Sequence, residues 1–387
     1  MDTKKSESRE VQIACPSLGS EEVEALKQTI ESGWITQGSQ VADFEQVFAK
    51  RHGAKYAVAT SSCTTGLHLI LKALDIGPGD EVIVPAFTWI ATANVVVQCG
   101  ATPVFVDIDP LTYNIDPTKI AAHITKKTRA VIVVHLFGLC ADIENIKAVL
   151  PEGVNLVEDA ACAVGATISD QKAGTFGTAA SFSFHPRKII TTGEGGMITT
   201  DDEHLYELLK MLRNHGATIS EERRHLSPKP FDLPDFDNCG FNYRMTDLQG
   251  AVGLVQMKKL DEMLSERQVR AANYIETFSE LTWLRMPMVP EYFYHSWQSF
   301  VTYLESEKSS ISRNEVMSAL HERGVATRPG THALHILGYY KKAFDFSPSD
   351  FPNSLASAQN SMAIPLHNQM SSEDYEYVIQ AINSLDV

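Results

Sequence analysis

Short apolar runs alternate with helix-like segments through the first half of the chain. Seven runs rich in Val, Ile, Ala and Phe have the length and composition of buried strands; they lie at residues 56–61, 81–85, 102–106, 130–134, 155–158, 180–184 and 197–200. Between several of them lie helix-like segments such as 64–74 and 89–99, and a Gly-Pro-Gly-Asp cluster at 77–80 predicts a turn. This alternation predicts an α/β fold in which helices cover both faces of a mostly parallel sheet.

The pattern changes in the second half of the chain. A long helix is predicted over residues 246–278, followed by strands at 300–304 and 325–328. A capping box at Ser312 and Glu315 opens a helix that Gly324 can end, and residues 371–385 form a last amphipathic helix. We therefore predict a flexible N-terminal tail over 1–12, a large domain over 13–255, and a linking helix with a smaller C-terminal α/β domain over 256–387.

Composition narrows the class of protein. The chain has 387 residues, 44% of them apolar and 21% charged, which suits an ordinary globular protein with a large core. The net charge of −15 and the absence of a basic run argue against nucleic acid as a partner. The first ten residues lack the apolar stretch of a secretion signal, and no run approaches the ~20 apolar residues that cross a bilayer. We expect a soluble cytoplasmic protein.

The six cysteines are scattered along the chain. They form no CxxC pair and have no histidine at metal-ligand spacing. We expect reduced thiols and no metal site.

Lys188 is the first candidate for chemistry. Ligands of open α/β sheets bind beyond the carboxyl ends of the strands, and Lys188 follows the strand predicted at 180–184 among small and apolar neighbours. Partial burial away from carboxylates would lower the pKa of its ammonium group and favour the neutral amine that forms a Schiff base. The alternative is a solvated lysine at the end of a strand.

Asp159 ends the run 154–158 and places a carboxylate at the rim of the same sheet. A buried carboxylate needs a cationic partner. The protonated pyridine nitrogen of pyridoxal 5′-phosphate (PLP) is such a partner, and this pair keeps PLP an effective electron sink. The alternative is that Asp159 caps the next helix.

Other residues could complete a cofactor site. The segment Ser-Cys-Thr-Thr-Gly at 62–66 lies between a strand and a helix, where backbone N–H groups attract a phosphate, and Ser183 could add a hydroxyl. Helix capping and a strand residue facing a helix are the alternatives. Trp89 could stack on a flat heteroaromatic ring or simply fill the core. Asn242 could be only a turn residue. The glycines at 193–196 do not match a dinucleotide fingerprint.

Five motifs occur in sequence order: Ser-Gly-Trp-Ile-Thr-Gln-Gly at 32–38, segment 85–94, Glu-Asp-Ala-Ala at 158–161, Ser-Phe-His-Pro-Arg-Lys-Ile-Ile-Thr-Thr-Gly-Glu-Gly-Gly at 183–196, and segment 240–249. Together they resemble the sugar aminotransferases of the DegT/DnrJ/EryC1/StrS family, a branch of the fold-type I, aspartate aminotransferase-like PLP enzymes. The resemblance covers nearly the whole chain and implies a large PLP-binding domain with a seven-stranded sheet.

The resemblance implies a role for each site residue. It makes Lys188 the Schiff-base lysine, Asp159 the partner of the pyridine nitrogen and Trp89 the stacking aromatic. The backbone at Cys63 and Thr64 would bind the phosphate with Ser183. It further implies a homodimer with two shared sites, in which Asn242 of one subunit reaches the phosphate pocket of the other and Arg244 lies close by.

Two residues depart from the family pattern. Cys63 replaces the usual glycine of the phosphate turn, which is tolerable if its φ is negative because only its N–H is needed. Cys162 replaces the common Gln or His three residues after the aspartate, where the side chain lies near the cofactor.

The resemblance also implies the reaction. The form His-Pro-x-Lys at 185–188 is similar to enzymes that act on 4-keto-6-deoxysugars. We therefore expect a ping-pong transfer of an amino group from L-glutamate, which leaves as 2-oxoglutarate, to the C4 ketone of a UDP- or dTDP-linked sugar. Its place would be amino-sugar biosynthesis for surface polysaccharide such as the O-antigen of lipopolysaccharide. Substrate contacts are expected from the residues His185, Arg187, Arg244 and Arg328, the arginines as candidates for the diphosphate or the donor carboxylate.

Four alternatives stay open at this stage. The chain could aminate a C3 ketosugar or a cyclitol, or it could bind PLP only as a regulator. A 3-dehydratase of the same family typically has His in place of the lysine, so Lys188 counts against that activity.

Overall fold

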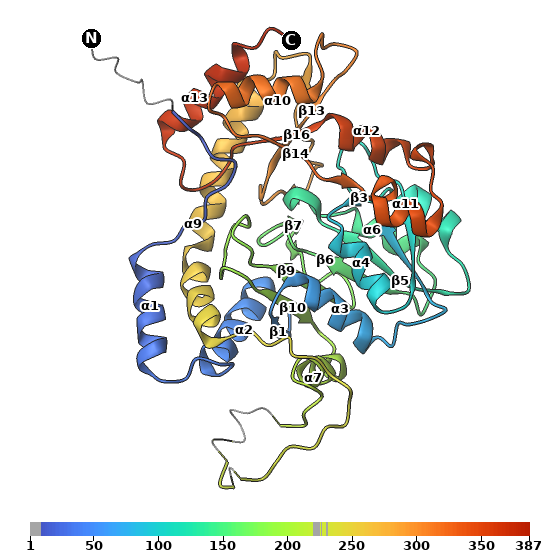
Figure 1. The fold of residues 1–387 in the computed structure, drawn as a ribbon, viewed down its shortest axis with the longest axis vertical. Helices are drawn as coiled ribbons and strands as arrows, with labels where there is room; N and C mark the ends of the chain where they lie inside the picture. Colours follow the sequence, from blue (N-terminus) through green and yellow to red (C-terminus); the bar gives the residue numbers. More distant parts are fainter. Residues whose placement is uncertain (1–8, 220–224, 226, 230) are drawn as a thin grey trace.

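The computed structural model describes residues 9–219, 225, 227–229 and 231–387. Its centre is a seven-stranded sheet of order β1-β10-β9-β6-β5-β2-β4 (Figure 1). The strands are β1 (Tyr56–Thr60), β2 (Glu81–Pro85), β4 (Thr102–Val106), β5 (Thr128–Val134), β6 (Asn155–Asp159), β9 (Ala179–Ser183) and β10 (Gly196–Thr200). Within this sheet β10 is antiparallel to both of its neighbours, and the other pairs are parallel. The predicted, mostly parallel sheet is confirmed.

Both faces of this sheet are covered by apolar side chains. Val131 and Val133 of β5 belong to one core cluster, whereas Ala130 and Ile132 belong to another, because alternate residues of a strand point to opposite faces. The first cluster packs under the helices α2 (Ser39–His52), α6 (Ile143–Val149) and α9 (Asp247–Thr277). The second packs under α3 (Cys63–Ala73), α4 (Ala91–Gln98) and α7 (Glu203–Leu212). The helices therefore fix the positions of the strand ends that carry the site.

The helix α9 joins the two domains without a break. It starts at a capping box formed by Thr246 and Gln249. Its first part packs closely on α2, because a Cβ atom at Gly253 would lie 2.5 Å from the ring of Phe44. Farther along, Tyr274 belongs to the core of the C-terminal domain. The boundary predicted at residue 256 lies inside this helix.

The smaller domain is built on a four-stranded sheet of order β11-β13-β16-β14. Its strands are β11 (Leu284–Arg285), β13 (Phe300–Leu304), β16 (Ser361–Ile364) and β14 (Arg328–Pro329), packed with α10 (Arg313–Glu322) and α13 (Ser372–Asn383). The strand predicted at 325–328 is wrong in extent, since β14 begins only at Arg328. Val325 instead bridges Val11, which is buried. Residues 1–8 of the predicted tail lie outside the described residues, and the chain is fixed to the small domain by Val11.

A second connection between the domains lies beside the strand ends. The short strand β15 (His332–Ala333) pairs with β3 (Phe87–Thr88) of the large domain. The helices α11 (Gly338–Phe344) and α12 (Pro352–Asn360) follow β15, and Tyr340 of α11 is buried in the core of the large domain. Of these segments from the second half of the chain, α11 lies beside α4 in Figure 1, and the Tyr340 hydroxyl donates to the side-chain oxygen of Asn94 at 2.8 Å.

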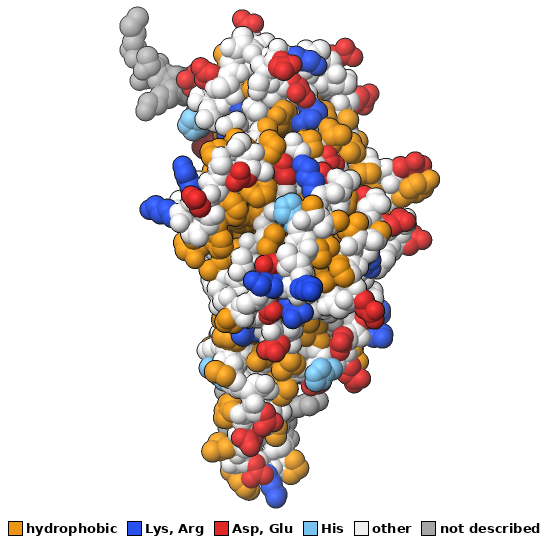
Figure 2. Space-filling model, turned by 90° about the vertical axis from the view of Figure 1, so that its right-hand side faces the viewer, with side chains coloured by type: hydrophobic (Ala, Val, Ile, Leu, Met, Phe, Trp, Pro, Cys, Tyr) orange, Lys and Arg blue, Asp and Glu red, His pale blue; other side chains and the backbone are white. Residues whose placement is uncertain are grey.

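The remaining elements complete the surface. They include α1 (Ser20–Glu31), α5 (Pro117–Ile120) and a small sheet of β12 (Phe293–Tyr294), β7 (Thr167–Ile168) and β8 (Gln171–Lys172). Figure 2 shows a face on which apolar patches are interspersed with charged side chains of both signs. Among the described residues, no helix combines the length and the apolar character that a membrane span requires.

Candidate active site

A cavity of about 350 Å³ lies beyond the carboxyl ends of β6 and β9, between the two domains. The large domain lines it with residues that follow its strands, and the small domain adds residues of β14 and β16. Most of the residues predicted to carry function line this one cavity: Cys63, Thr64, Trp89, Asp159, Cys162, Ser183, His185, Arg187, Lys188 and Arg328. This position agrees with the expectation that the functional residues lie at the carboxyl ends of the strands.

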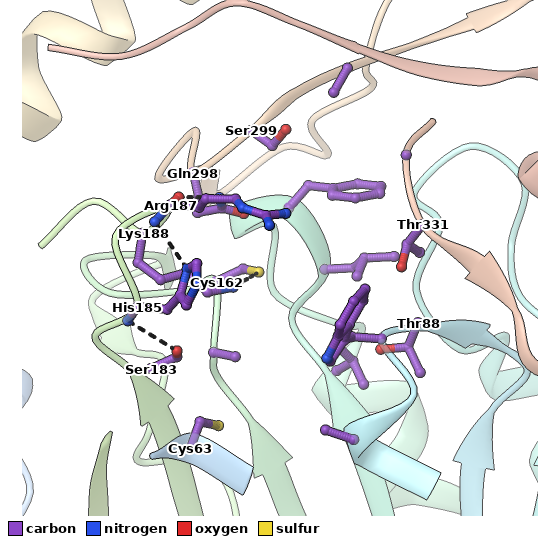
Figure 3. Close-up of a pocket in the computed structure, with 18 of the residues that line it drawn as sticks. Cys63, Thr88, Cys162, Ser183, His185, Arg187, Lys188, Gln298, Ser299 and Thr331 are labelled. Atoms are coloured by element: carbon purple, nitrogen blue, oxygen red, sulfur yellow. Dashed lines mark hydrogen bonds between the residues drawn. The ribbon is translucent and has the colours of Figure 1, made fainter. Parts of the chain in front are cut away.

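Lys188 points into the cavity from the turn that follows β9 (Figure 3). Its backbone N–H donates to the carbonyl of His185 at 2.8 Å, which closes the turn. The side chain is partly buried, and its Nζ donates a hydrogen bond to the thiol of Cys162 at 3.1 Å.

The predicted direction of the Lys188 pKa is wrong. Burial alone would lower the pKa of the ammonium group, but Cys162, and more weakly Asp159, raise it above its ordinary value. The prediction assumed that no carboxylate lies near Lys188, whereas the fold brings one carboxylate and two thiols around it.

Asp159 is buried at the end of β6, with 5% of its surface exposed. Thr92 donates its hydroxyl to Oδ2 at 2.7 Å, and the backbone N–H of Ala161 donates to Oδ1 at 3.2 Å. Burial raises the pKa of the Asp159 carboxyl, although these two donors and the charge of Lys188 lower it in part. A cation at Asp159 would therefore offset the cost of burying this charge.

Thr92 is a site residue that the sequence analysis missed. It lies in the first turn of α4, three residues after Trp89, and is fully buried. The sequence gives no separate signal for it, because Trp89 precedes the helix and only the fold brings Thr92 to Asp159. The hydroxyl orients the Asp159 carboxylate.

A second buried network holds the end of β6 in place. Glu158 and His135 are both fully buried, with His135 Nε2 2.9 Å from Glu158 Oε2. The Glu158 carboxylate also accepts the backbone N–H groups of Gly174, Phe176 and Gly177, each at 2.7 Å. The adjacent Asp159 is thus fixed by a rigid strand end rather than by a mobile loop.

The start of α3 forms the floor of the cavity. Ser62 caps this helix by accepting the N–H of Thr65 at 3.1 Å, so the N–H groups of Cys63 and Thr64 have no acceptor within the helix. The strand β10 passes so close that a Cβ atom at Gly196 would lie 2.6 Å from the Cys63 nitrogen. Ser183 is also in the lining, at the end of β9. These groups can cradle a phosphate.

Cys63 fits this turn without strain. It is the first residue of α3 and does not adopt a positive φ, so its N–H is available as a glycine's would be. Its thiol is buried and donates to the carbonyl of Ser181 at 3.4 Å. Burial raises the pKa of the thiol well above its ordinary value, which keeps Cys63 neutral.

Trp89 stands at the rim of the cavity, not in the core. Its side chain is 59% exposed, and its ring centroid lies 5.6 Å from that of His332 in β15. Trp89 therefore does not fill the core, and its indole ring is accessible to a ligand.

Asn242 and Arg244 do not line the cavity of their own chain. Asn242 is exposed and bridges Asn214 through the backbone, and Arg244 Nη1 donates to the side-chain oxygen of Asn214 at 2.7 Å. Their predicted roles remain predictions.

The profile of one protein family matches residues 16–383, almost the full chain. The chain belongs to the DegT/DnrJ/EryC1/StrS aminotransferase family. The spore coat polysaccharide biosynthesis protein SpsC of Bacillus subtilis is 40% identical over 372 residues, which cover 96% of this chain and 95% of SpsC.

Solved structures of the family have the same fold. The sugar aminotransferase Spr1654 from Streptococcus pneumoniae, in its PMP form, superposes with a TM-score of 0.89 at 29% identity and covers 97% of both chains. A mutant of the GDP-4-keto-6-deoxymannose-3-dehydratase ColD with bound GDP-perosamine superposes with a TM-score of 0.88 at 29% identity, covering 96% of this chain and 100% of ColD. The aspartate aminotransferase-like fold predicted from the sequence is confirmed.

This DegT/DnrJ/EryC1/StrS chain is a PLP-dependent aminotransferase of the sugar-modifying type. The cavity fits PLP: the amine of Lys188 lies in the lining, the buried carboxylate of Asp159 forms no ion pair with any described residue, and the N-terminus of α3 can take a phosphate. No group of three or more His, Cys, Asp or Glu in the described part of the chain is arranged to hold a metal ion.

Proposed function

We propose that this enzyme transfers an amino group from L-glutamate to the C4 ketone of a UDP- or dTDP-linked 4-keto-6-deoxysugar. The observation that carries the proposal is the Lys188 amine, which lies in a cavity that also holds Asp159 and two arginines. The product would enter surface polysaccharide, a role supported by the similarity to a spore coat polysaccharide biosynthesis protein.

Each residue of the cavity would have its own role in this reaction. PLP, when bound, supplies an electron sink for the negative charge left on carbon after a proton is removed. Lys188 would hold the cofactor at rest and, once displaced by the donor, move the proton to and from the reacting carbon. Asp159 would keep the ring nitrogen protonated. The N–H groups of Cys63 and Thr64 with Ser183 would hold the phosphate, and Trp89 would stack on the ring.

We further propose a homodimer with shared sites. Asn242 is exposed and lies outside the cavity of its own chain, which supports its predicted role in the phosphate pocket of the partner, with Arg244 near it. Mixing Asn242→Ala chains with Lys188→Ala chains would test this proposal. Activity restored in the mixture supports sharing, and no recovery contradicts it.

A dehydratase activity is the second candidate, since ColD has the same fold. The lysine in this chain argues against it, because those enzymes typically have His there. Incubation with UDP- and dTDP-linked 4-keto and 3-keto sugars, analysed by mass spectrometry, separates the outcomes. An amino-sugar formed only with glutamate present supports the proposal, and loss of water without nitrogen uptake contradicts it. The Lys188→Ala variant should form no amino-sugar.

A further inference from the structure

Two arginines face the same space without a carboxylate partner. Arg187 lies on the wall of the cavity that carries Lys188 (Figure 3), and Arg328 enters the lining at the start of β14, in the small domain. Neither guanidinium makes an ion pair in the part of the chain that the structure describes. Burial, and then the charge of Arg328, lower the pKa of Arg187, so the two cations are close enough to repel each other.

The other charged groups of the lining do not offset this repulsion. Asp159 is held by Thr92 at the buried end of β6, and Glu194 forms no ion pair with Arg187 or Arg328. Burial lowers the pKa of His185 below its ordinary value, so this side chain is neutral near pH 7. A protein with a net charge of −15 thus concentrates positive charge around this cavity. Such an arrangement is typical of an anion site.

Arg187 is held in place by its neighbours. Its carbonyl accepts a hydrogen bond from Gln298 at 2.9 Å, and its N–H donates to His185 at 3.2 Å. These contacts fix the backbone and leave the guanidinium free to bind a ligand. Because Lys188 is the next residue, an anion on Arg187 lies near the place where nitrogen is exchanged.

We propose that Arg187 and Arg328 form one anion site that serves both half-reactions. In the first it binds the side-chain carboxylate of a dicarboxylic amino donor, and in the second it binds the diphosphate of the nucleotide-linked sugar. This inference rests on the proposed function, because it assumes that both substrates react at Lys188.

The two ligands have comparable reach. Both must place their reacting carbon beside the Lys188 amine. In glutamate the side-chain carboxylate carbon is three bonds from that carbon. In a sugar that reacts at C4 the first phosphorus is five bonds away. Because C4 and C1 face each other across a closed ring, the distance from C4 to this phosphorus is shorter than five bonds of an open chain would span. One pair of guanidinium groups, which bind carboxylate and phosphate alike, can therefore meet both anions.

The test uses UDP and dTDP as probes of the donor half-reaction. PLP-loaded enzyme is mixed with glutamate, and the cofactor spectrum is followed in a single turnover at increasing UDP or dTDP. The shared site predicts that one of them raises the glutamate concentration needed for half the limiting rate and leaves the limiting rate unchanged. Glutamine has the same shape as glutamate but no side-chain charge, so it serves as the matched donor.

Variants then assign the residues. Arg328→Gln and Arg187→Gln should each weaken glutamate saturation and nucleotide binding together, by about tenfold or more, and leave glutamine saturation unchanged. Arg129→Gln is the control, since Arg129 is exposed, pairs with Asp80 and lies outside the cavity.

Three results would overturn the shared site. One is nucleotide inhibition that lowers the limiting rate without competing with glutamate. Another is a variant that loses nucleotide binding but keeps glutamate saturation. The third is an equal loss for glutamate and glutamine, since that would place the arginine at the α-carboxylate. If wild-type enzyme shows no spectral change with glutamate at all, the proposed function itself is wrong.

Discussion

Replacing Thr92 with valine tests whether its hydroxyl sets the charge state of Asp159. Valine has nearly the shape of threonine, so the buried side chain keeps its volume. It loses the 2.7 Å hydrogen bond to Oδ2 and a longer one of 3.4 Å between its hydroxyl and that of Thr88. The Asp159 carboxylate then keeps the N–H of Ala161 as its only remaining hydrogen bond from nitrogen or oxygen among the described residues. A hydrogen bond to a charged acceptor contributes about 1.5–3 kcal/mol.

The sign of the effect follows from the form that Thr92 stabilises. Its hydroxyl donates to the ionised carboxylate and so lowers the pKa of Asp159, which burial raises. The substitution should raise this pKa further. Since only ionised Asp159 pairs with a protonated ring nitrogen, PLP should bind about tenfold or more weakly, and the pH below which binding declines should move upward.

The measurement is a PLP titration of the cofactor-free protein, followed by absorbance at several pH values. Thr302→Val is the matched control, because Thr302 is equally buried but donates to a neutral carbonyl at 2.9 Å in the small domain. The reasoning is wrong if Thr92→Val binds PLP as tightly as wild type with the same pH dependence, or if Thr302→Val reproduces its effect.

Three further predictions concern the same cavity. Because burial raises the pKa of Asp159, its ionised form destabilises the cofactor-free fold. Asp159→Asn should therefore raise the melting temperature of the PLP-free protein near neutral pH, and this gain should disappear toward about pH 4. An unchanged melting temperature would contradict this. Gly196→Ala should push the phosphate turn at Cys63 and weaken PLP binding, whereas Gly338→Ala, which has open space, should not; equal titrations would count against the cradle. Cys162→Ala removes the thiol that raises the pKa of Lys188, so a larger fraction of the lysine should be neutral near pH 7. The cofactor-free protein should then bind PLP covalently faster, by about tenfold for each unit that this pKa falls. Stopped-flow absorbance measures this rate, and a rate equal to that of wild type would refute the prediction.

The main sheet could be predicted from the sequence because its strands are short continuous apolar runs. All seven strands begin and end within two residues of the predicted positions. The long helix predicted over residues 246–278 matches α9, which runs over Asp247–Thr277. Elements of two residues, such as β3 and β15, carry no periodic signal, and only tertiary packing creates them.

The site was predictable where a family motif marks it and less so where side chains from different segments meet. Lys188, Asp159 and Ser183 belong to motifs, and the structure places all three in one cavity. Thr92 lies inside the motif at 85–94, but that motif does not reveal its partner, since the contact with Asp159 arises only where the start of α4 meets the end of β6 in the fold. The raised pKa of Lys188 also depends on such a meeting, with Cys162 26 residues away in the chain.

The pairing of β15 with β3 has a consequence for how ligands reach the cavity. Backbone contacts join His332 to Thr88 and Ala333 to Phe87, and the N–H of Leu334 donates to the carbonyl of Ala86 at 2.7 Å. A wide swing of the small domain would break this seam next to Trp89. Admission of a bulky sugar should therefore depend on rotamer changes at the rim, and crystals of the enzyme should survive a substrate soak without cracking.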